Sequence, residues 1–327
     1  MRIFKHLLPF ILGVLFILLL NAALNYMLIP YQFTRVKVHK VETETFDDLI
    51  LGSSHGGTAF DPTALTAETG RSSYNACAGG QFPMDNYYLL LDALREHAPK
   101  RVIFEYDPNY WISLDPFNRT ARYQESVMAP SAVRFEYFSK LLLPGDIRYV
   151  LMPWSLYESG LKDIRRIVER KQSDDYKNYA VEPFNEKGSQ ACDENGFLSI
   201  PDDVGGDPKI PDLFYTDGME HIVAKNREYF EKIVRLCQKK GIELVVVTTP
   251  VPAATREATE DFYCTAHEWM KDLSTAYGFT YLDFVLPSEN KDALPDLCED
   301  PKGFSDGEGH MHISAARNFT QVLASYL

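Results

Sequence analysis

The chain has 327 residues, of which 45% are hydrophobic and 24% are charged, with 33 basic and 46 acidic side chains and a formal net charge of −13. This apolar content excludes an intrinsically disordered chain, which lacks the apolar side chains whose burial offsets the entropy of ordering. The acidic excess argues against a broad nucleic-acid-binding surface, which is normally basic, so we expect no nucleic-acid partner. The mean hydropathy of −0.23 is that of a soluble protein, but the average conceals one strongly apolar segment.

That segment is the run LLPFILGVLFILLLNAALNYMLI at residues 7–29, whose distinctly polar members are Asn21, Asn25 and Tyr26. About 20 apolar residues cross a bilayer as a helix, and two basic residues precede the run, as in a signal anchor. We expect an uncleaved single-pass anchor at residues 1–30. A cleaved signal peptide and a buried core helix are the alternatives. Basic residues lie on both sides of the run, so their count does not decide its orientation.

After a predicted linker at residues 31–44, strand-like and helix-like segments alternate. Short runs rich in apolar and β-branched residues predict strands at 48–52, 74–77, 101–106, 242–249 and 279–284. Amphipathic periodicity predicts helices at 219–240, 255–277 and 314–327. This alternation predicts an α/β fold, a three-layer sandwich with a mainly parallel five-stranded sheet, because parallel strands need helical crossovers that cover both faces.

Residues 112–215 interrupt the alternation with clusters of Pro, Gly and Asp, no clear strand, and one helical run at about 161–171. We interpret them as an irregular insertion within a domain that spans 45–327, rather than as an independent domain. The helical run carries five basic residues, which form either a solvated helix face or a surface for anionic lipid or a phosphate-rich polymer.

Residues that can carry chemistry first occur after the first predicted strand, in Leu51-Gly-Ser-Ser-His-Gly-Gly57. Ligands of open α/β sheets bind at the carboxyl ends of strands, and the spacing around Ser54 matches G-x-S-x-G, the pattern of a nucleophile elbow. The loop after the second predicted strand, Tyr74-Asn-Ala-Cys-Ala-Gly-Gly-Gln81, has paired glycines that can present backbone N–H groups to an oxyanion. Each loop alone also fits an ordinary strand-to-helix turn.

A third group precedes the last predicted helix, where Asp306, Glu308, His310 and His312 lie within seven positions. A serine becomes a good nucleophile when a histidine, oriented by a carboxylate, takes its proton. Two histidines and a carboxylate also suit zinc, so a metal-dependent hydrolase using Asp306, His310 and His312 is an alternative, and a polar surface loop is another. No second ligand cluster occurs in the sequence, and we expect neither a metal nor an organic cofactor.

An early serine, a glycine loop and a late Asp and His, in this chain order, resemble the SGNH (GDSL-like) hydrolases. The similarity is greatest to their membrane-anchored branch, which includes the D-alanyl lipoteichoic acid transfer protein. Gly52-Ser53-Ser54 matches the leading G-x-S block, Asn75–Gly80 the glycine block, and His310–Ala316 the closing block. The resemblance covers about residues 45–110 and 220–327.

The resemblance implies a role for each matched residue. Ser54 is the nucleophile, His310 the general base and Asp306 the carboxylate that orients the imidazole. The backbone N–H groups of Ser54 and Gly80 form an oxyanion hole.

Three positions depart from the family pattern. The family's Asp usually lies three residues before the His, where this chain has Gly307, so Glu308 remains an alternative to Asp306 as the orienting carboxylate. The family's oxyanion asparagine block is absent, which leaves Asn109 as a candidate donor. His312 stands at an asparagine position of the closing block, which favours a supporting role.

The resemblance therefore implies a serine-dependent ester hydrolase or O-acyltransferase that acts on an acylated envelope glycan or lipid. It also implies a location at the cell membrane, with the catalytic domain outside the cytoplasm, and a membrane-bound O-acyltransferase as a partner. The alternative is a catalytically weak or inactive SGNH-fold binding or scaffold protein in an envelope-modification complex. The absent asparagine block and the shifted Asp motivate that alternative.

Overall fold

The computed structural model describes residues 2–112, 119–142, 148, 151–181, 190–205, 209–210, 224–287, 294–300 and 302–327. At its centre is a five-stranded sheet in which every neighbouring pair of strands is parallel. In chain order the strands are β1 (Asp48–Leu51), β2 (Ser73–Asn75), β3 (Arg101–Glu105), β6 (Glu243–Thr248) and β7 (Thr280–Asp283). The predicted α/β fold is confirmed, and each strand lies within about two residues of its predicted range.

The strand order is β2-β1-β3-β6-β7, so the chain moves from β1 outward to β2 and then back across β1 to β3. In open α/β sheets such a reversal leaves a crevice at the carboxyl ends of the two strands concerned, and ligands bind there. The register pairs Leu51, the last residue of β1, with Phe104 of β3. The loops that follow β1 and β3 therefore start side by side.

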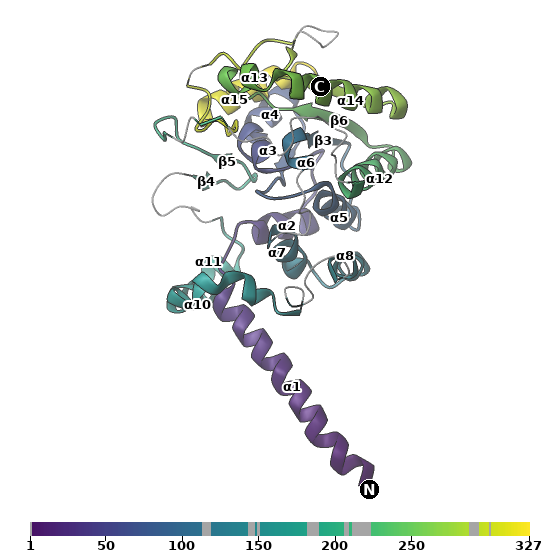
Figure 1. Ribbon diagram of the computed structural model, residues 1–327, viewed down its shortest axis with the longest axis vertical. Helices are drawn as coiled ribbons and strands as arrows, with labels where there is room; N and C mark the ends of the chain where they lie inside the picture. The colour runs from purple at the N-terminus through teal and green to yellow at the C-terminus, as the bar shows by residue number, and fades with distance from the viewer. Residues whose placement is uncertain are drawn as a thin grey trace.

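Helices cover both faces of the sheet and give the predicted three layers (Figure 1). Successive side chains of a strand point to opposite faces. On one face, Leu49 and Val102 belong to a buried apolar cluster that includes, among others, residues of three helices. These helices are α5 (Pro83–Ala93), α12 (Ala224–Lys240) and α14 (Glu260–Tyr277).

On the opposite face, Ile50 and Ile103 belong to a second buried cluster. This cluster includes residues of α3 (Ser54–Ala59), α4 (Pro62–Thr69) and α15 (Ile313–Ala324). Because α3 follows β1 and α15 is the last helix, this layer brings an early and a late part of the chain together on the same face of the sheet.

The helices predicted at 219–240 and 314–327 correspond to α12 and α15, although residues 219–223 lie outside the described part of the chain. The single helix predicted at 255–277 is two helices, α13 (Ala253–Ala258) and α14. They are separate because Thr259 leaves the helical conformation, with φ −132° and ψ 24°.

Residues 34–43, which we expected to lie in a linker, form the helix α2 (Thr34–Thr43). Val38 and Val41 are fully buried and join the first apolar cluster. Lys37 is buried as well and donates a hydrogen bond to the carbonyl oxygen of Cys77. The prediction of a linker is wrong for this helix, because its burial depends on tertiary contacts that the polar pattern does not indicate. The boundaries of the domains stay a prediction.

The predicted insertion contains more regular structure than we expected. Its described helices are α7 (Arg119–Val127), α8 (Ala132–Leu142), η1 (Pro153–Lys162), α10 (Ile164–Gln172) and α11 (Asp174–Lys177), with α6 (Pro108–Trp111) just before it. The helical run predicted at 161–171 matches α10. The expectation of no strand is wrong, because β4 (Ala191–Cys192) and β5 (Leu198–Ser199) form an antiparallel pair. These elements are too short to give a clear periodic pattern.

The N-terminal helix α1 (Arg2–Leu28) projects from the rest of the molecule (Figure 1). Its Leu7–Leu28 stretch has a mean hydropathy of 2.6, and none of its most apolar window is buried, so it is long and apolar enough to cross a membrane. This exposure contradicts the alternative of a buried core helix. An anchor and a signal sequence both remain consistent with it.

Candidate active site

The candidate nucleophile lies on the sharp turn between β1 and α3. Ser53 caps α3, accepting a hydrogen bond from the His55 N–H, and Ser54 is the first helical residue. Glu105, at the end of β3, supports the turn by accepting the Ser53 N–H on Oε2 at 2.7 Å. A β-carbon at Gly52 would lie 2.5 Å from the Glu105 β-carbon, so only glycine fits there.

Ser54 forms a continuous hydrogen-bonded series with His310 and Asp306, both of which lie more than 250 residues later in the chain. Ser54 Oγ lies 2.9 Å from His310 Nε2, and His310 Nδ1 lies 2.8 Å from Asp306 Oδ2. A hydroxyl next to an imidazole that is oriented by a carboxylate is the arrangement that activates a serine for attack on a carbonyl carbon. The structure thus brings together the three residues predicted to act as nucleophile, base and orienting group.

The loop before α15 wraps around Asp306. The Oδ1 atom of Asp306 accepts hydrogen bonds from the backbone N–H groups of Glu308, Gly309 and His310 at 3.0, 3.0 and 3.2 Å. Burial alone would raise the pKa of Asp306, but its hydrogen bond with His310, the charge of that ring and the backbone N–H groups lower it to about 2. Asp306 is therefore ionised at neutral pH.

Of the two carboxylates that could orient His310, Asp306 is the one hydrogen-bonded to the ring. The exposed side chain of Glu308 makes no hydrogen bond with His310 among the described residues, and its backbone N–H instead supports Asp306. Gly309, with φ +112°, allows the loop to curl, so a spacing of four residues places Asp306 correctly.

The predicted oxyanion donors are the backbone N–H groups of Ser54 and Gly80, with Asn109 as a further candidate. The Ser54 N–H, the first of α3, has no hydrogen-bond partner among the described residues, as expected at a helix start. A β-carbon at Gly79 would lie 3.8 Å from the Ser54 β-carbon, so the glycine loop contacts the nucleophile, and Gly80 adopts φ +78°. Asn109 lies in α6, just after β3. The roles of Gly80 and Asn109 stay predictions.

A second histidine–aspartate pair, which the sequence did not lead us to expect, flanks the first. His55 Nδ1 lies 3.0 Å from Asp107 Oδ2, and the rings of His55 and His310 are 4.6 Å apart. Burial would lower the pKa of His55, but the charge and hydrogen bond of Asp107 outweigh burial and raise it to about 9. Burial alone would raise the pKa of Asp107, but the charge and hydrogen bond of His55, with the backbone N–H of Tyr110, together lower it. His55 is thus a cation at neutral pH.

Two buried polar atoms, one of this pair and one beside it, have no hydrogen-bond partner in the described part of the chain. They are His55 Nε2 and Glu105 Oε1. Burial and the charge of Asp107 raise the pKa of Glu105 to about 7. Both His55 and Asp107 stand at positions that the sequence marks, since His55 follows the candidate nucleophile and Asp107 follows the third predicted strand. The sequence pattern does not indicate that they pair.

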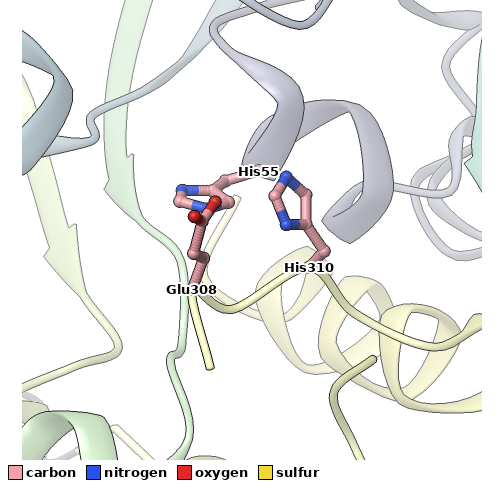
Figure 2. A group of neighbouring side chains, drawn as sticks. All are labelled: His55, Glu308 and His310. Atoms are coloured by element: carbon pink, nitrogen blue, oxygen red, sulfur yellow. The ribbon is translucent and has the colours of Figure 1, made fainter. Parts of the chain in front are cut away.

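Several of these side chains could hold a divalent cation. His55, Glu308 and His310 each offer a ligand atom within 4.8 Å of the others, and Figure 2 shows Glu308 beside the His55 ring with His310 facing them. The Nδ1 atoms of both histidines face carboxylates, as is usual for histidines that bind zinc. A metal bound to His310 Nε2 would compete with the Ser54 hydroxyl.

The metal site considered from the sequence has a different composition, with His312 as a ligand. Both ring nitrogens of His312 face carbonyl oxygens, of Lys302 at 2.7 Å and of Val204 at 2.8 Å. Neither nitrogen is left to bind a metal, so the Asp306, His310 and His312 set is not assembled. His312 instead ties the loop before α15 to the insertion.

Comparisons with known proteins add little to this site. No family model matches the sequence, and no curated protein matches it. Among solved structures, the chain is similar to one from Desulfitobacterium hafniense DCB-2 that is described as a lipolytic protein of the G-D-S-L family. The TM-score is 0.37 and the identity 10%, over 86% of this chain and 99% of that one. A likeness this weak supports no conclusion about activity.

Proposed function

We propose that this protein is a serine-dependent ester hydrolase or O-acyltransferase that acts on an acylated cell-envelope molecule at a membrane surface. One observation carries the proposal. Ser54, His310 and Asp306 form an unbroken hydrogen-bonded series at the carboxyl ends of β1 and β3. This is the edge at which an α/β sheet presents its ligand site.

In the first half of the reaction, Ser54 Oγ attacks the acyl carbonyl carbon while His310 Nε2 takes the hydroxyl proton. The ionised Asp306 stabilises the resulting imidazolium. The Ser54 N–H, with Gly80 and Asn109 as the other candidate donors, faces the negative charge that develops on the carbonyl oxygen. His310 then gives its proton to the leaving alcohol, and the acyl group remains on Ser54.

In the second half, His310 takes a proton from a water molecule or from the hydroxyl of an acceptor. The resulting oxygen nucleophile attacks the acyl-serine carbon, and Ser54 leaves with the proton from His310. Water gives a carboxylic acid, and an alcohol gives a new ester. The same residues therefore serve hydrolysis and transfer, and access of the acceptor decides between them.

The apolar helix α1 and the resemblance to the membrane-anchored SGNH branch support an envelope substrate and a neighbouring membrane-bound O-acyltransferase. An inactive binding or scaffold protein remains the second candidate. One observation favours it, because the residue after Tyr106, near the absent asparagine block, is Asp107, which is committed to His55. The longer spacing between Asp306 and His310 is a weaker reason for this alternative, since the two side chains are hydrogen-bonded despite it.

The decisive experiment is labelling of the full chain in detergent with a fluorophosphonate probe, which reacts with activated serines. We expect labelling of the wild type and none of Ser54→Ala, with ester hydrolysis reduced on the order of 10⁴-fold or more. Ser53→Ala is the matched control, because it changes the adjacent serine, which caps α3 and lies outside the hydrogen-bonded series. A folded wild type that does not label would favour the scaffold alternative.

A further inference from the structure

A continuous part of the insertion, residues 151–172, contacts the end of α1 nearest the domain. We call it the juxtamembrane segment; it comprises η1, α10 and the two residues before η1. Figure 1 shows α10 beside this end of α1. The contacts explain the polar residues that interrupt the apolar run. Asn21 donates to the Leu151 carbonyl at 2.9 Å and accepts from Trp154 Nε1 at 2.9 Å.

Further contacts hold the segment in one place along α1. The Trp154 backbone N–H donates to Asn25 Oδ1 at 3.1 Å. Lys171 Nζ donates to the Tyr26 carbonyl at 2.7 Å and lies 5.2 Å from the centre of the Tyr26 ring. The juxtamembrane segment therefore does not swing freely about α1, so its depth in a membrane changes together with the depth of α1.

That depth follows from the geometry of a helix. Asn21 lies about 10 Å along the helix axis from Leu28, the end of the apolar stretch, given the rise per residue of an α-helix. Interfacial segments bury their apolar side chains about 5–10 Å into the boundary between headgroups and acyl chains. When Leu7–Leu28 crosses a bilayer, the residues bonded to Asn21 must therefore lie within that boundary.

The exposed side chains of the segment suit this position. Leu151, Met152 and Leu161 expose 51%, 38% and 63% of their surface to solvent, although apolar side chains of a soluble domain are usually buried. Trp154 bonds to Asn21 and Asn25 of α1, and the ring of Tyr26, which belongs to α1, lies beside Lys171. Such aromatic residues are enriched at membrane interfaces.

The charge of the segment points to the kind of lipid. Residues 151–172 carry five basic and three acidic side chains, in a chain whose overall charge is −13. The side chains of Arg165 and Arg166 are 91% and 61% exposed. Clusters of this kind next to a membrane-spanning helix are attracted to anionic headgroups.

We propose that the juxtamembrane segment is a membrane-binding surface that lies at the boundary between the headgroups and the acyl chains of an anionic bilayer, around α1. It fixes the orientation of the α/β domain relative to the membrane. The proposal does not depend on whether Ser54 is a nucleophile.

The test measures the depth of a spin label in the full chain, reconstituted into vesicles of phosphatidylcholine with or without phosphatidylglycerol. Leu161→Cys is labelled with a nitroxide in a Cys264→Ser background, because Cys264 has the one exposed thiol and the other four cysteines are buried. The matched control is a label on Cys264 of the otherwise unchanged chain. It lies on α14, far from α1 in Figure 1.

We expect oxygen, which partitions into lipid, to relax the label at position 161, and a water-soluble nickel chelate to relax the label at position 264. Met152→Cys should give the same result as Leu161→Cys, which guards against a local distortion. Equal nickel accessibility at positions 152, 161 and 264 would overturn the proposal.

The anionic preference has its own test. Phosphatidylglycerol should move the label at position 161 deeper than phosphatidylcholine alone, and Arg165→Gln with Arg166→Gln should remove this difference. An equal depth in both lipid mixtures for the parent chain would overturn the assignment of an anionic lipid partner.

Discussion

The spacing between Asp306 and His310 is one residue longer than in the family that the chain resembles, yet the loop between them closes around the carboxylate. Asp306 should therefore be the group that fixes the tautomer and orientation of His310. We expect Asp306→Asn to lower kcat for a model ester on the order of 10³–10⁴-fold with little change in KM. An amide can occupy the same place but cannot stabilise an imidazolium by its charge.

Glu308→Gln is the matched control for that substitution, because Glu308 lies in the same loop and its side chain is exposed. Its backbone N–H, which supports Asp306, is retained in the variant. We expect a kcat close to that of the wild type. A large loss in Glu308→Gln and a small one in Asp306→Asn would exchange the roles of the two carboxylates.

The second pair, His55 with Asp107, should make stability depend on pH. The pKa of His55 is raised from 6.5 to about 9 in the folded state, so the pair stabilises the fold fully below about pH 6.5. This contribution, on the order of 3 kcal/mol, is lost as the pH rises through 9. We expect the free energy of unfolding, measured with denaturant, to fall between about pH 6.5 and 9 in the wild type and to change less in His55→Gln.

Asp107→Asn should reduce the change in the free energy of unfolding over the same pH range, since the charge of Asp107 is the main cause that raises the pKa of His55. Glu105 is distinguishable from this pair. Its pKa is raised from 4.5 to about 7, so its contribution lowers the free energy of unfolding as the pH rises from about 4.5 to 7 and changes no further above that range. If His55→Gln kept the full slope above pH 7, the assignment to His55 would be wrong.

At the scale of elements, the connection from β1 to α3 depends on close packing against β3. A β-carbon at Gly56 would lie 2.8 Å from Cys77 Sγ and 2.9 Å from the Glu105 β-carbon. We expect Gly56→Ala to lower the free energy of unfolding by about 1–3 kcal/mol and to reduce activity, because the shift would displace Ser54. The changes are measured by denaturant unfolding and ester hydrolysis.

Gly205→Ala is the matched control, because no heavy atom lies within 4 Å of a β-carbon there and its backbone has no positive φ. We expect its stability to stay within about 0.5 kcal/mol of the wild type. Equal effects of the two substitutions would mean that the contact with Glu105 does not limit the turn.

At the scale of the whole molecule, α2 joins the N-terminal helix to the α/β domain as part of its core. A chain that begins at Tyr31 keeps the buried Val36, Val38 and Val41, whereas one that begins at Thr45 loses them. Burial of each valine contributes about 1.5–3 kcal/mol relative to exposure. We expect the shorter chain to have a markedly lower Tm, or not to fold, by differential scanning calorimetry. Similar Tm values for the two chains would mean that α2 does not contribute to the stability of the domain.

Much of the fold could be predicted because it rests on local patterns. The strand runs from Leu49 and from Val245 are apolar on both faces, as parallel strands buried under helices must be. The helix α14 was predicted except for its start, since a single residue, Thr259, separates it from α13. The helix α2 was missed because its lysine at position 37 is buried only through a contact with the distant Cys77 carbonyl.

The sequence by itself determined the apolar N-terminal helix, the parallel α/β sheet, and the identities of Ser54, His310 and Asp306 as candidate residues. These follow from periodicity and from residue types at short spacing, which act over one or two elements. Only the tertiary structure decided that Asp306 rather than Glu308 holds His310, that His55 pairs with Asp107, and that the juxtamembrane segment bonds to Asn21. Each of these depends on which distant atoms come within hydrogen-bond distance, and that distance is set by the packing of the whole chain.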